Sequence, residues 1–296
     1  MKAYTSNNIR NIAVLGHGGK GKTTLCEAML YIAGASDRLG RVADGNTVLD
    51  FDSEEKRRKS SVSSAMAALE WDNTKLNIID APGLFDFEGG AAEAVRAAEA
   101  VLIVTSAGSG VDVGTEKAFR AADKKGAAKF FAVTKTDSDH RNFYKTFDAL
   151  KEVYGNKLCP TIIPYMEGNI TKCYVNLMTG MAFSYDENGK ATKVPVPEDS
   201  VIEEMTSAFM EAVATTDDAL MEKFFEGEKF TKEEILKGLC IGIFDGSIYP
   251  VYAVSGLTCA GVDQLLYGLA WSAPGAFGYA GEKCTYENGE EGILPC

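Results

Sequence analysis

The sequence is poor in the side chains that most often bind metals or form disulfide scaffolds. It has two histidines, His17 and His140, and neither belongs to an HxxxH or HxxE arrangement. Its seven cysteines are scattered without a CxxC pair. These absences argue against a histidine-rich metal site, a zinc site and a disulfide framework, and we expect reduced thiols that mostly fill the core.

Long apolar runs are also missing, and the N-terminal stretch MKAYTSNNIR is polar. Both features argue against a transmembrane helix and a secretory signal, so we expect a soluble cytoplasmic protein with no membrane partner. With 46% hydrophobic and 24% charged residues, the composition is that of an ordinary globular protein and excludes wholesale disorder.

Acidic charge is concentrated in one segment. The net charge is −12, and residues 161–250 contain 16 acidic and 7 basic side chains, whereas residues 1–160 contain 21 and 22. An acidic face repels phosphate backbones, so we expect no direct sequence-specific binding of nucleic acid by this chain. A basic protein partner for the segment and a merely solvated acidic surface both remain open.

Short apolar runs alternate with helical patterns along most of the chain. The runs are NIAVL (11–15), KLNIID (75–80, the third expected strand), AVLIVTS (100–106), AKFFAVT (128–134) and YPVYAV (249–254). Runs this continuous are typical of strands buried on both faces. The order predicts an α/β fold with a mostly parallel six-stranded sheet and helices on both of its faces.

The alternation breaks after Cys159-Pro160 and resumes only at residue 249. Residues 158–247 therefore read as an α+β insertion that carries the acidic charge, within an α/β domain made of residues 8–157 and 248–274. Residues 275–296 show no helical or strand period, and we expect a tail or the start of a following domain.

A glycine-rich loop follows the first strand and opens a helical pattern. The stretch GHGGKGKT (16–23) fits GxxxxGK[ST], the phosphate-binding P-loop. Its glycines let backbone N–H groups converge on phosphate oxygens, Lys22 would bridge the β- and γ-phosphates, and the Thr23 hydroxyl would bind Mg²⁺. The residues expected to contact the nucleotide here are Gly16, His17, Gly18, Gly19, Lys20, Gly21, Lys22, Thr23 and Thr24.

Three further motifs lie at the C-terminal ends of expected strands. In DAPG (80–83), Asp80 can hold Mg²⁺ through water and the Gly83 N–H can sense a γ-phosphate, although Asp-x-Pro-Gly is also an ordinary turn. In TKTD (134–137), Asp137 can accept two hydrogen bonds from guanine while Lys135 covers the ring, a pairing that adenine cannot offer. The last motif could offer backbone N–H groups to guanine O6 from Ser255, Gly256 and Leu257.

Taken in this order, the motifs resemble the ribosome-associated translational GTPases, and among them the nucleotide-binding first domain of elongation factor G. The resemblance extends over about residues 8–274. DAPGLFDF (80–87) is similar to the family's DTPGHVDF, and DDALMEKFFEGEKFTKEEI (217–235) is similar to an insertion that the shorter elongation factor Tu type lacks. WDNTKLNIID (71–80) is also similar to the tetracycline-resistance ribosomal protection proteins.

The resemblance implies a P-loop GTPase domain that binds GTP or GDP with Mg²⁺ and hydrolyses GTP. It also implies a ribosomal partner, including the ribosomal stalk protein, engaged through the full-length protein. Two alternatives stay open: a GTP-dependent binding module that hydrolyses GTP weakly, and a ribosomal protection factor.

The sequence departs from the family pattern within four motifs. Gly19 replaces an aspartate in the P-loop, and Ser61 replaces the Mg²⁺-binding threonine of RGIT, here Arg58-Lys59-Ser60-Ser61. Thr134 replaces the usual asparagine of the guanine motif, and Leu84 replaces the histidine that positions the attacking water. With Lys22 and Gly83 as the other candidate catalytic residues, these departures predict a divergent elongation-factor-G-like paralogue with slow hydrolysis in the isolated domain.

Overall fold

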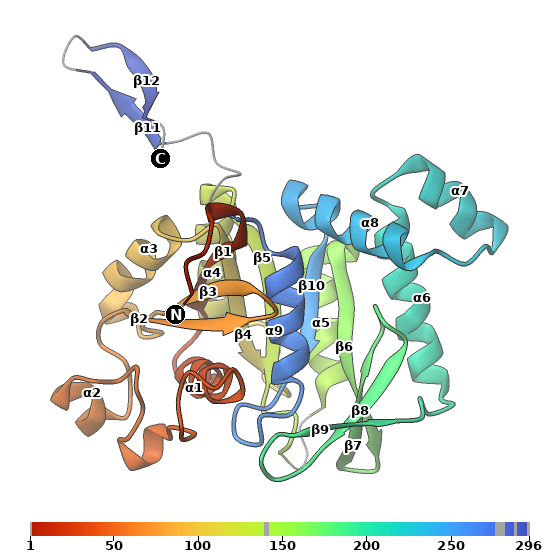
Figure 1. Cartoon of the computed structure of the whole chain (residues 1–296), viewed down its shortest axis with the longest axis horizontal. Helices are drawn as coiled ribbons and strands as arrows, with labels where there is room; N and C mark the ends of the chain where they lie inside the picture. Colours follow the sequence, from red (N-terminus) through yellow and green to blue (C-terminus); the bar gives the residue numbers. More distant parts are fainter. Residues whose placement is uncertain (1, 139–141, 276–281, 287–288, 295–296) are drawn as a thin grey trace.

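The computed structural model describes residues 2–138, 142–275, 282–286 and 289–294, so His140 lies outside the described residues. One ten-stranded sheet runs through the molecule (Figure 1). In spatial order its strands are β2 (Ala65–Trp71), β3 (Thr74–Asp80), β1 (Ile9–Leu15), β4 (Ala100–Ser106), β5 (Ala128–Thr134), β10 (Tyr249–Ala253), β6 (Leu158–Glu167), β7 (Ile170–Asn176), β8 (Met181–Tyr185) and β9 (Ala191–Val194).

Helices join these strands. They are α1 (Lys22–Ile32), α2 (Ser53–Arg58), α3 (Glu88–Arg96), α4 (Val113–Lys125), α5 (Phe143–Tyr154), α6 (Ser200–Ala214), α7 (Asp218–Glu226), α8 (Lys232–Asp245) and α9 (Val262–Ser272). Single 3-10 turns occur at Ser6–Asn8, Val42–Asp44, Phe85–Phe87 and Gly155–Lys157.

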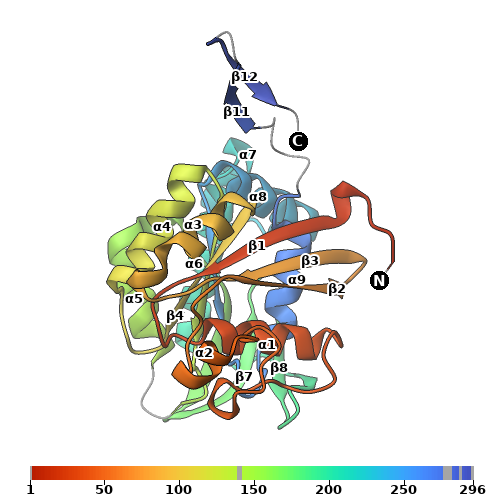
Figure 2. The same ribbon diagram turned by 90° about the vertical axis from the view of Figure 1, so that its left-hand side faces the viewer.

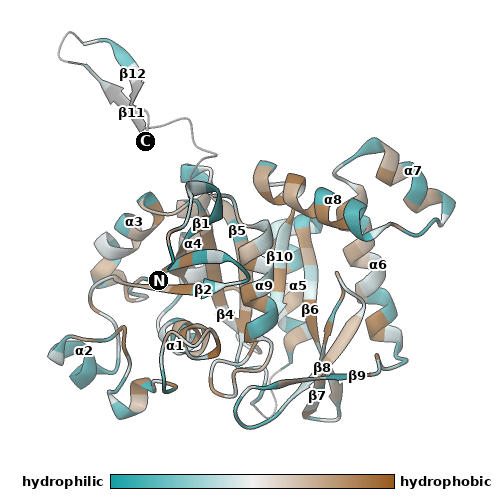
Figure 3. Ribbon diagram, viewed as in Figure 1, coloured by the Kyte–Doolittle hydropathy of each residue, from teal (hydrophilic) through white to brown (hydrophobic). Residues whose placement is uncertain are grey.

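The predicted α/β architecture is confirmed. All five apolar runs form strands, and the helices α1 and α9 pack on one face of the sheet while α3, α4 and α5 pack on the other (Figure 2). The strands β4 and β5 are buried at every residue, as expected for parallel strands covered on both faces. The central strands are accordingly hydrophobic, whereas the peripheral helices α2 and α7 are largely hydrophilic (Figure 3).

The sheet has more strands than the six predicted. Its parallel part consists of β3, β1, β4, β5, β10 and β6, and the antiparallel strands β2 and β7–β9 extend it at both edges. The sequence obscured β6 because Pro160 and Pro164 lie within it, and proline is uncommon in interior strands. A shift in the β10–β6 register between Val251 and Tyr252 accommodates this irregularity.

The expected insertion, residues 158–247, therefore begins in the main sheet and not beside it. Its strands β6–β9 continue the sheet from β10, and α6 packs on β6. The limits of the insertion as a separate subdomain stay a prediction.

Residues 275–296 include a hairpin that the sequence pattern did not indicate, and their assignment as a tail or the start of a following domain stays a prediction. β11 (Glu282–Thr285) pairs with β12 (Glu291–Leu294) in an antiparallel hairpin. Its turn is closed by hydrogen bonds of 2.8 Å from the Tyr286 N–H to the Glu290 carbonyl and from the Gly289 N–H to the Tyr286 carbonyl. Four-residue strands that pair only with each other are too short to give a recognisable period in the sequence.

The cysteines are free thiols, as expected, wherever the structure describes their side chains. Cys26, Cys159, Cys173 and Cys259 are buried and Cys240 is exposed, whereas the side chains of Cys284 and Cys296 lie outside the described part of the chain. Within that part, no helix is both long and apolar enough to cross a membrane.

Candidate functional site

The P-loop joins β1 to α1 through glycines in conformations that other residues rarely adopt. Gly16 has φ 141° and Gly21 has φ 90°. A Cβ at Gly16 would lie 2.2 Å from the Val104 carbonyl oxygen of β4, so no side chain fits there. The loop consequently brings its backbone close to the sheet and directs it into the N-terminus of α1, the geometry that collects N–H groups around an anion.

Lys22, the first residue of α1, carries a buried positive charge. Its side chain is only 7% exposed, and Nζ donates to the carbonyl oxygens of Gly16 at 3.0 Å and His17 at 3.2 Å. Burial lowers the pKa of Lys22, and the nearby carboxylate of Asp80 offsets part of that effect. Among the described residues Lys22 forms no ion pair, so the arrangement favours an anionic ligand at this position.

Thr23, Ser61 and Asp80 come together from α1, the loop after α2 and the end of β3. The Thr23 hydroxyl donates to Asp80 Oδ2 at 2.6 Å and lies 3.1 Å from Ser61 Oγ. The sequence-predicted Mg²⁺ residues are thus neighbours in the fold. Burial raises the pKa of the Asp80 carboxyl to about 7, against the opposing effects of Lys22 and the Thr23 hydroxyl.

These three residues suit Mg²⁺. Asp80 Oδ1 is buried and has no hydrogen-bond partner, while Oδ2 of the same carboxyl accepts from the Thr23 hydroxyl, which lies beside that of Ser61. Carboxylate and hydroxyl oxygens are hard ligands of the kind that Mg²⁺ prefers. A cation held there would displace a proton from Asp80 near neutral pH. In the described part of the chain no cluster of three His, Cys, Asp or Glu side chains could hold a metal, which is consistent with a cation that takes most of its ligands from phosphate and water.

Two acidic residues that sequence reasoning missed hold the segment before α2. Asp50, 3% exposed, accepts from the Ser61 hydroxyl at 2.9 Å, and burial raises its pKa. Glu27 of α1, fully buried, accepts from the Val48 and Leu49 N–H groups at 2.8 and 3.0 Å. The only sequence signal of a role for Glu27 was its charge within an otherwise apolar helical stretch. The sequence around Asp50 gave no such signal.

A third such residue, Glu55, orders the loop that carries Ser61. It is 1% exposed, and its Oε1 accepts from the N–H groups of Val62 and Ser63 at 2.9 and 3.1 Å. Asp52 caps α2 in a capping box with the same glutamate. The hydroxyl of Ser61 is therefore presented by a hydrogen-bonded loop.

Gly83 and Leu84 follow β3 directly beside the P-loop. A Cβ at Gly83 would lie 2.2 Å from Lys22 Nζ and 2.8 Å from the Gly18 nitrogen, so only glycine fits. The Leu84 side chain is 39% exposed and lies against Gly18, where a Cβ would be 3.0 Å from Leu84 Cδ2. The predicted catalytic position is thus next to the phosphate loop and is occupied by an apolar side chain.

The TKTD loop contacts the P-loop from the other side. The Thr134 hydroxyl lies 2.6 Å from the Lys20 carbonyl oxygen and 3.0 Å from that of Thr105, so threonine still ties the two loops together. Lys135, with φ 60°, donates to the Gly19 carbonyl at 2.7 Å. Asp137 is exposed at the end of the loop.

The loop after β10 packs against the first turn of α1. A Cβ at Gly256 would lie 3.0 Å from the carbonyl of Thr24, and Ser255 is fully buried, with Oγ accepting from the Thr258 N–H at 3.2 Å. Leu257 is 53% exposed. Both loops that the sequence predicts to recognise guanine therefore lie next to the P-loop.

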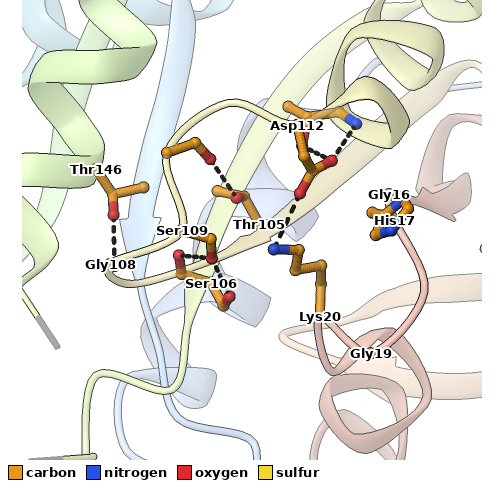
Figure 4. Close-up of polar contacts among 12 residues, drawn as sticks. Gly16, His17, Gly19, Lys20, Thr105, Ser106, Gly108, Ser109, Asp112 and Thr146 are labelled. Carbon is orange, nitrogen blue, oxygen red and sulfur yellow. Dashed lines mark hydrogen bonds and ion pairs between the residues drawn. The ribbon is translucent and has the colours of Figure 1, made fainter.

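An ion pair between Lys20 and Asp112 was also missed by sequence reasoning (Figure 4). Lys20 Nζ lies 3.0 Å from Asp112 Oδ2, and Asp112 caps α4 by accepting from the Thr115 N–H at 2.9 Å. Burial would raise the pKa of Asp112, but the Thr115 N–H and Lys20 lower it overall. Lys20 lines a cavity of about 420 Å³ between the P-loop and the loop after β4, and Lys135 lines the same cavity.

Comparison with known proteins agrees with this geometry. Residues 7–274 match the family model of the Elongation factor Tu GTP binding domain. Two proteins called Elongation factor G-like protein, from Mycobacterium tuberculosis strains CDC 1551 / Oshkosh and ATCC 25618 / H37Rv, are each 33% identical over 261 residues. The match covers 87% of this chain but only 36% of each relative.

A crystal structure of a protein from Thermus thermophilus has the same fold. It is 34% identical, with a TM-score of 0.86, and the match covers 94% of this chain and 42% of that chain. The chain therefore belongs to the elongation factor Tu GTP-binding domain family, in the form found in elongation factor G-like proteins.

Proposed function

We propose that this chain is the GTP-binding and GTP-hydrolysing switch domain of an elongation factor G-like translation factor that acts on the ribosome in the cytoplasm. The observation that carries the proposal is the buried ammonium of Lys22, which has no carboxylate partner among the described residues and lies at the N-terminus of α1. A triphosphate seated on the P-loop would supply the missing negative charge.

In this proposal the P-loop N–H groups and Lys22 bind the phosphates. Thr23, Ser61 and Asp80 would hold Mg²⁺, directly or through water, and the cation would neutralise charge that develops on the phosphates. The Gly83 N–H would contact the γ-phosphate, because Gly83 approaches Lys22 so closely. Release of that phosphate would loosen Ser61 and Gly83, so the segments 47–63 and 80–87 are the proposed switches.

Guanine would be recognised by Asp137, with Lys135 over the ring and the backbone of Ser255, Gly256 and Leu257 at O6. A carboxylate can accept from both N–H donors of guanine, and adenine has no such pair. The positions of both loops beside the P-loop support this assignment.

The substitution Asp137→Asn should weaken GTP binding by at least about 100-fold, because two charge-assisted hydrogen bonds of about 1.5–3 kcal/mol each are lost. Xanthosine triphosphate should bind better than to the wild type, because its C2 carbonyl suits the amide. Calorimetric titration measures both affinities, and Asp148→Asn, an exposed carboxylate on α5, is the control. Equal binding of ATP and GTP by the wild type would contradict the assignment of the TKTD loop.

Hydrolysis is the step in which this chain should differ from its family. Leu84 has no atom that could orient an attacking water, and it lies at the P-loop where the family has histidine. Ground-state binding through Lys22 and Thr23 does not depend on Leu84, so binding and hydrolysis should separate. The same residue favours a second candidate function, a GTP-dependent binding module or ribosomal protection factor that hydrolyses GTP weakly.

We expect Leu84→His to accelerate single-turnover phosphate release in the full-length protein with ribosomes by about 100-fold, equivalent to roughly 3 kcal/mol of barrier. GTP affinity should stay unchanged. Leu84→Ala is the control for simple removal of the leucine side chain and should not accelerate release. A wild-type rate equal to or above that of the histidine variant would show that another group places the water.

The acidic inserted segment offers a surface for a basic partner such as a ribosomal stalk protein. A groove of about 700 Å³ borders α6 and α7, and it is lined by acidic side chains and by apolar ones. The acidic residues are Glu198, Asp199, Glu203 and Glu228, and the apolar ones include Ile202, Met210, Phe224 and Phe230. The groove is also lined by Lys229, but its four acidic residues leave it net negative, so a basic amphipathic helix would match both its charge and its apolar lining.

Neutralising this groove with Glu203→Gln and Glu228→Gln together should slow association with the stalk protein by about two- to fivefold and leave dissociation nearly unchanged, because peripheral charges mainly steer encounter. Raising the ionic strength should reduce the wild-type rate as well. Stopped-flow association kinetics measure both effects, with the exposed Glu187→Gln as a control in the same acidic segment. Association that is insensitive to salt would contradict this docking site.

A further inference from the structure

A chain of hydroxyl groups connects the inserted segment to the guanine-recognition loop. Thr136, the third residue of TKTD, is 3% exposed, and its Oγ1 lies 2.7 Å from the hydroxyl oxygen of Tyr174 on β7. Thr136 Oγ1 also donates to the Val254 carbonyl at 3.0 Å. Because the threonine hydroxyl has one proton and the carbonyl can only accept, Tyr174 must donate to Thr136.

The hydrogen-bonded hydroxyls of Thr136 and Tyr174 hold three segments of the protein together. Thr136 lies between Lys135 and Asp137, and Val254 directly precedes Ser255, so both proposed guanine loops end at the same pair of hydroxyls. A second bond from β7 reinforces the contact, since the Thr171 hydroxyl donates to the Thr136 carbonyl at 2.9 Å. The TKTD loop is therefore attached to β7 through both the side chain and the backbone of Thr136.

The surroundings fix Tyr174 in turn. The residue is 4% exposed and its ring packs edge-on against Tyr185 with a centroid distance of 5.5 Å. Tyr185 donates to Asp263 of α9 at 2.6 Å, and a Cβ at Gly261 would lie 3.5 Å from the Tyr174 ring. Burial also raises the pKa of Tyr174, so its hydroxyl keeps the proton that it donates.

We propose that Tyr174 is a positioning residue for guanine recognition: its hydroxyl, supplied by the inserted segment, sets the location of the Asp137 loop and thereby the residence time of the nucleotide. The inference rests on the proposed role of Asp137 in binding guanine. Asp137 is exposed, so its placement depends on the residues that anchor its loop, and a carboxylate that serves two donors tolerates little displacement. The inserted segment is then a structural part of the nucleotide site.

The test is the rate of GDP release from the intact chain after Tyr174→Phe, which removes only the hydroxyl. We expect release about 3- to 10-fold faster, the change that the loss of one neutral hydrogen bond produces. The preference for GDP over ADP should fall by the same factor, which a general loss of stability would not cause. Tyr144→Phe is the matched control, because the Tyr144 hydroxyl on α5 donates to the Pro164 carbonyl of β6 at 2.6 Å, so this substitution also removes one hydrogen bond between a tyrosine and the inserted segment.

Thr136→Val provides a second, independent variant, since valine keeps the shape and removes both hydroxyl bonds. The double variant Tyr174→Phe, Thr136→Val should release GDP no faster than Thr136→Val alone, because both substitutions remove the same hydrogen bond between the two hydroxyls. The inference alone would be overturned if the wild type prefers GDP over ADP but Tyr174→Phe releases GDP at the wild-type rate, or no faster than Tyr144→Phe does. A wild type that does not prefer GDP over ADP would overturn the proposed function together with it.

Discussion

The ammonium group of Lys22 is buried at the first turn of α1, and among the described residues only two backbone carbonyls accept hydrogen bonds from it. A buried charge that forms no ion pair is unfavourable even with the carboxylate of Asp80 nearby, so the site favours an anionic ligand. Two glycines leave room for this arrangement, because a Cβ at Gly83 would collide with the ammonium and a Cβ at Gly16 would collide with β4. Burying this charge lowers the stability of the nucleotide-free protein, and a bound anion recovers that free energy.

The parallel sheet gathers the other groups around this charge. The ends of β1, β3, β5 and β10 lie at one edge, so four motifs far apart in the sequence become neighbours. This much could be predicted, because each motif is local and its place at a strand end follows from the pattern of apolar runs. The strand β6 could not, because its two prolines gave no interior-strand signal and its place depends on pairing with β10, about 90 residues later along the chain.

Contacts between polar residues far apart in the sequence could not be predicted either. Lys20 pairs with Asp112, and Tyr174 donates to Thr136, yet neither partner belongs to a motif that names the other. Glu27 lies in a helix whose apolar pattern gave no reason for a carboxylate, and its role appears only when the N–H groups of the following segment reach it. Such pairs depend on tertiary geometry, which spacing along the chain does not encode.

The central claim is that the positive charge of Lys22 binds the ligand and does not stabilise the fold. The substitution Lys22→Met tests this claim most directly. Methionine has a similar length and no charge, so the nucleotide-free variant should melt at the wild-type temperature or above it. Its affinity for GTP should nevertheless fall by about 100-fold or more, since a charge-assisted contact to the phosphates is lost. A nucleotide-free variant that unfolds at a markedly lower temperature, or one that binds GTP as tightly as the wild type, would contradict the account.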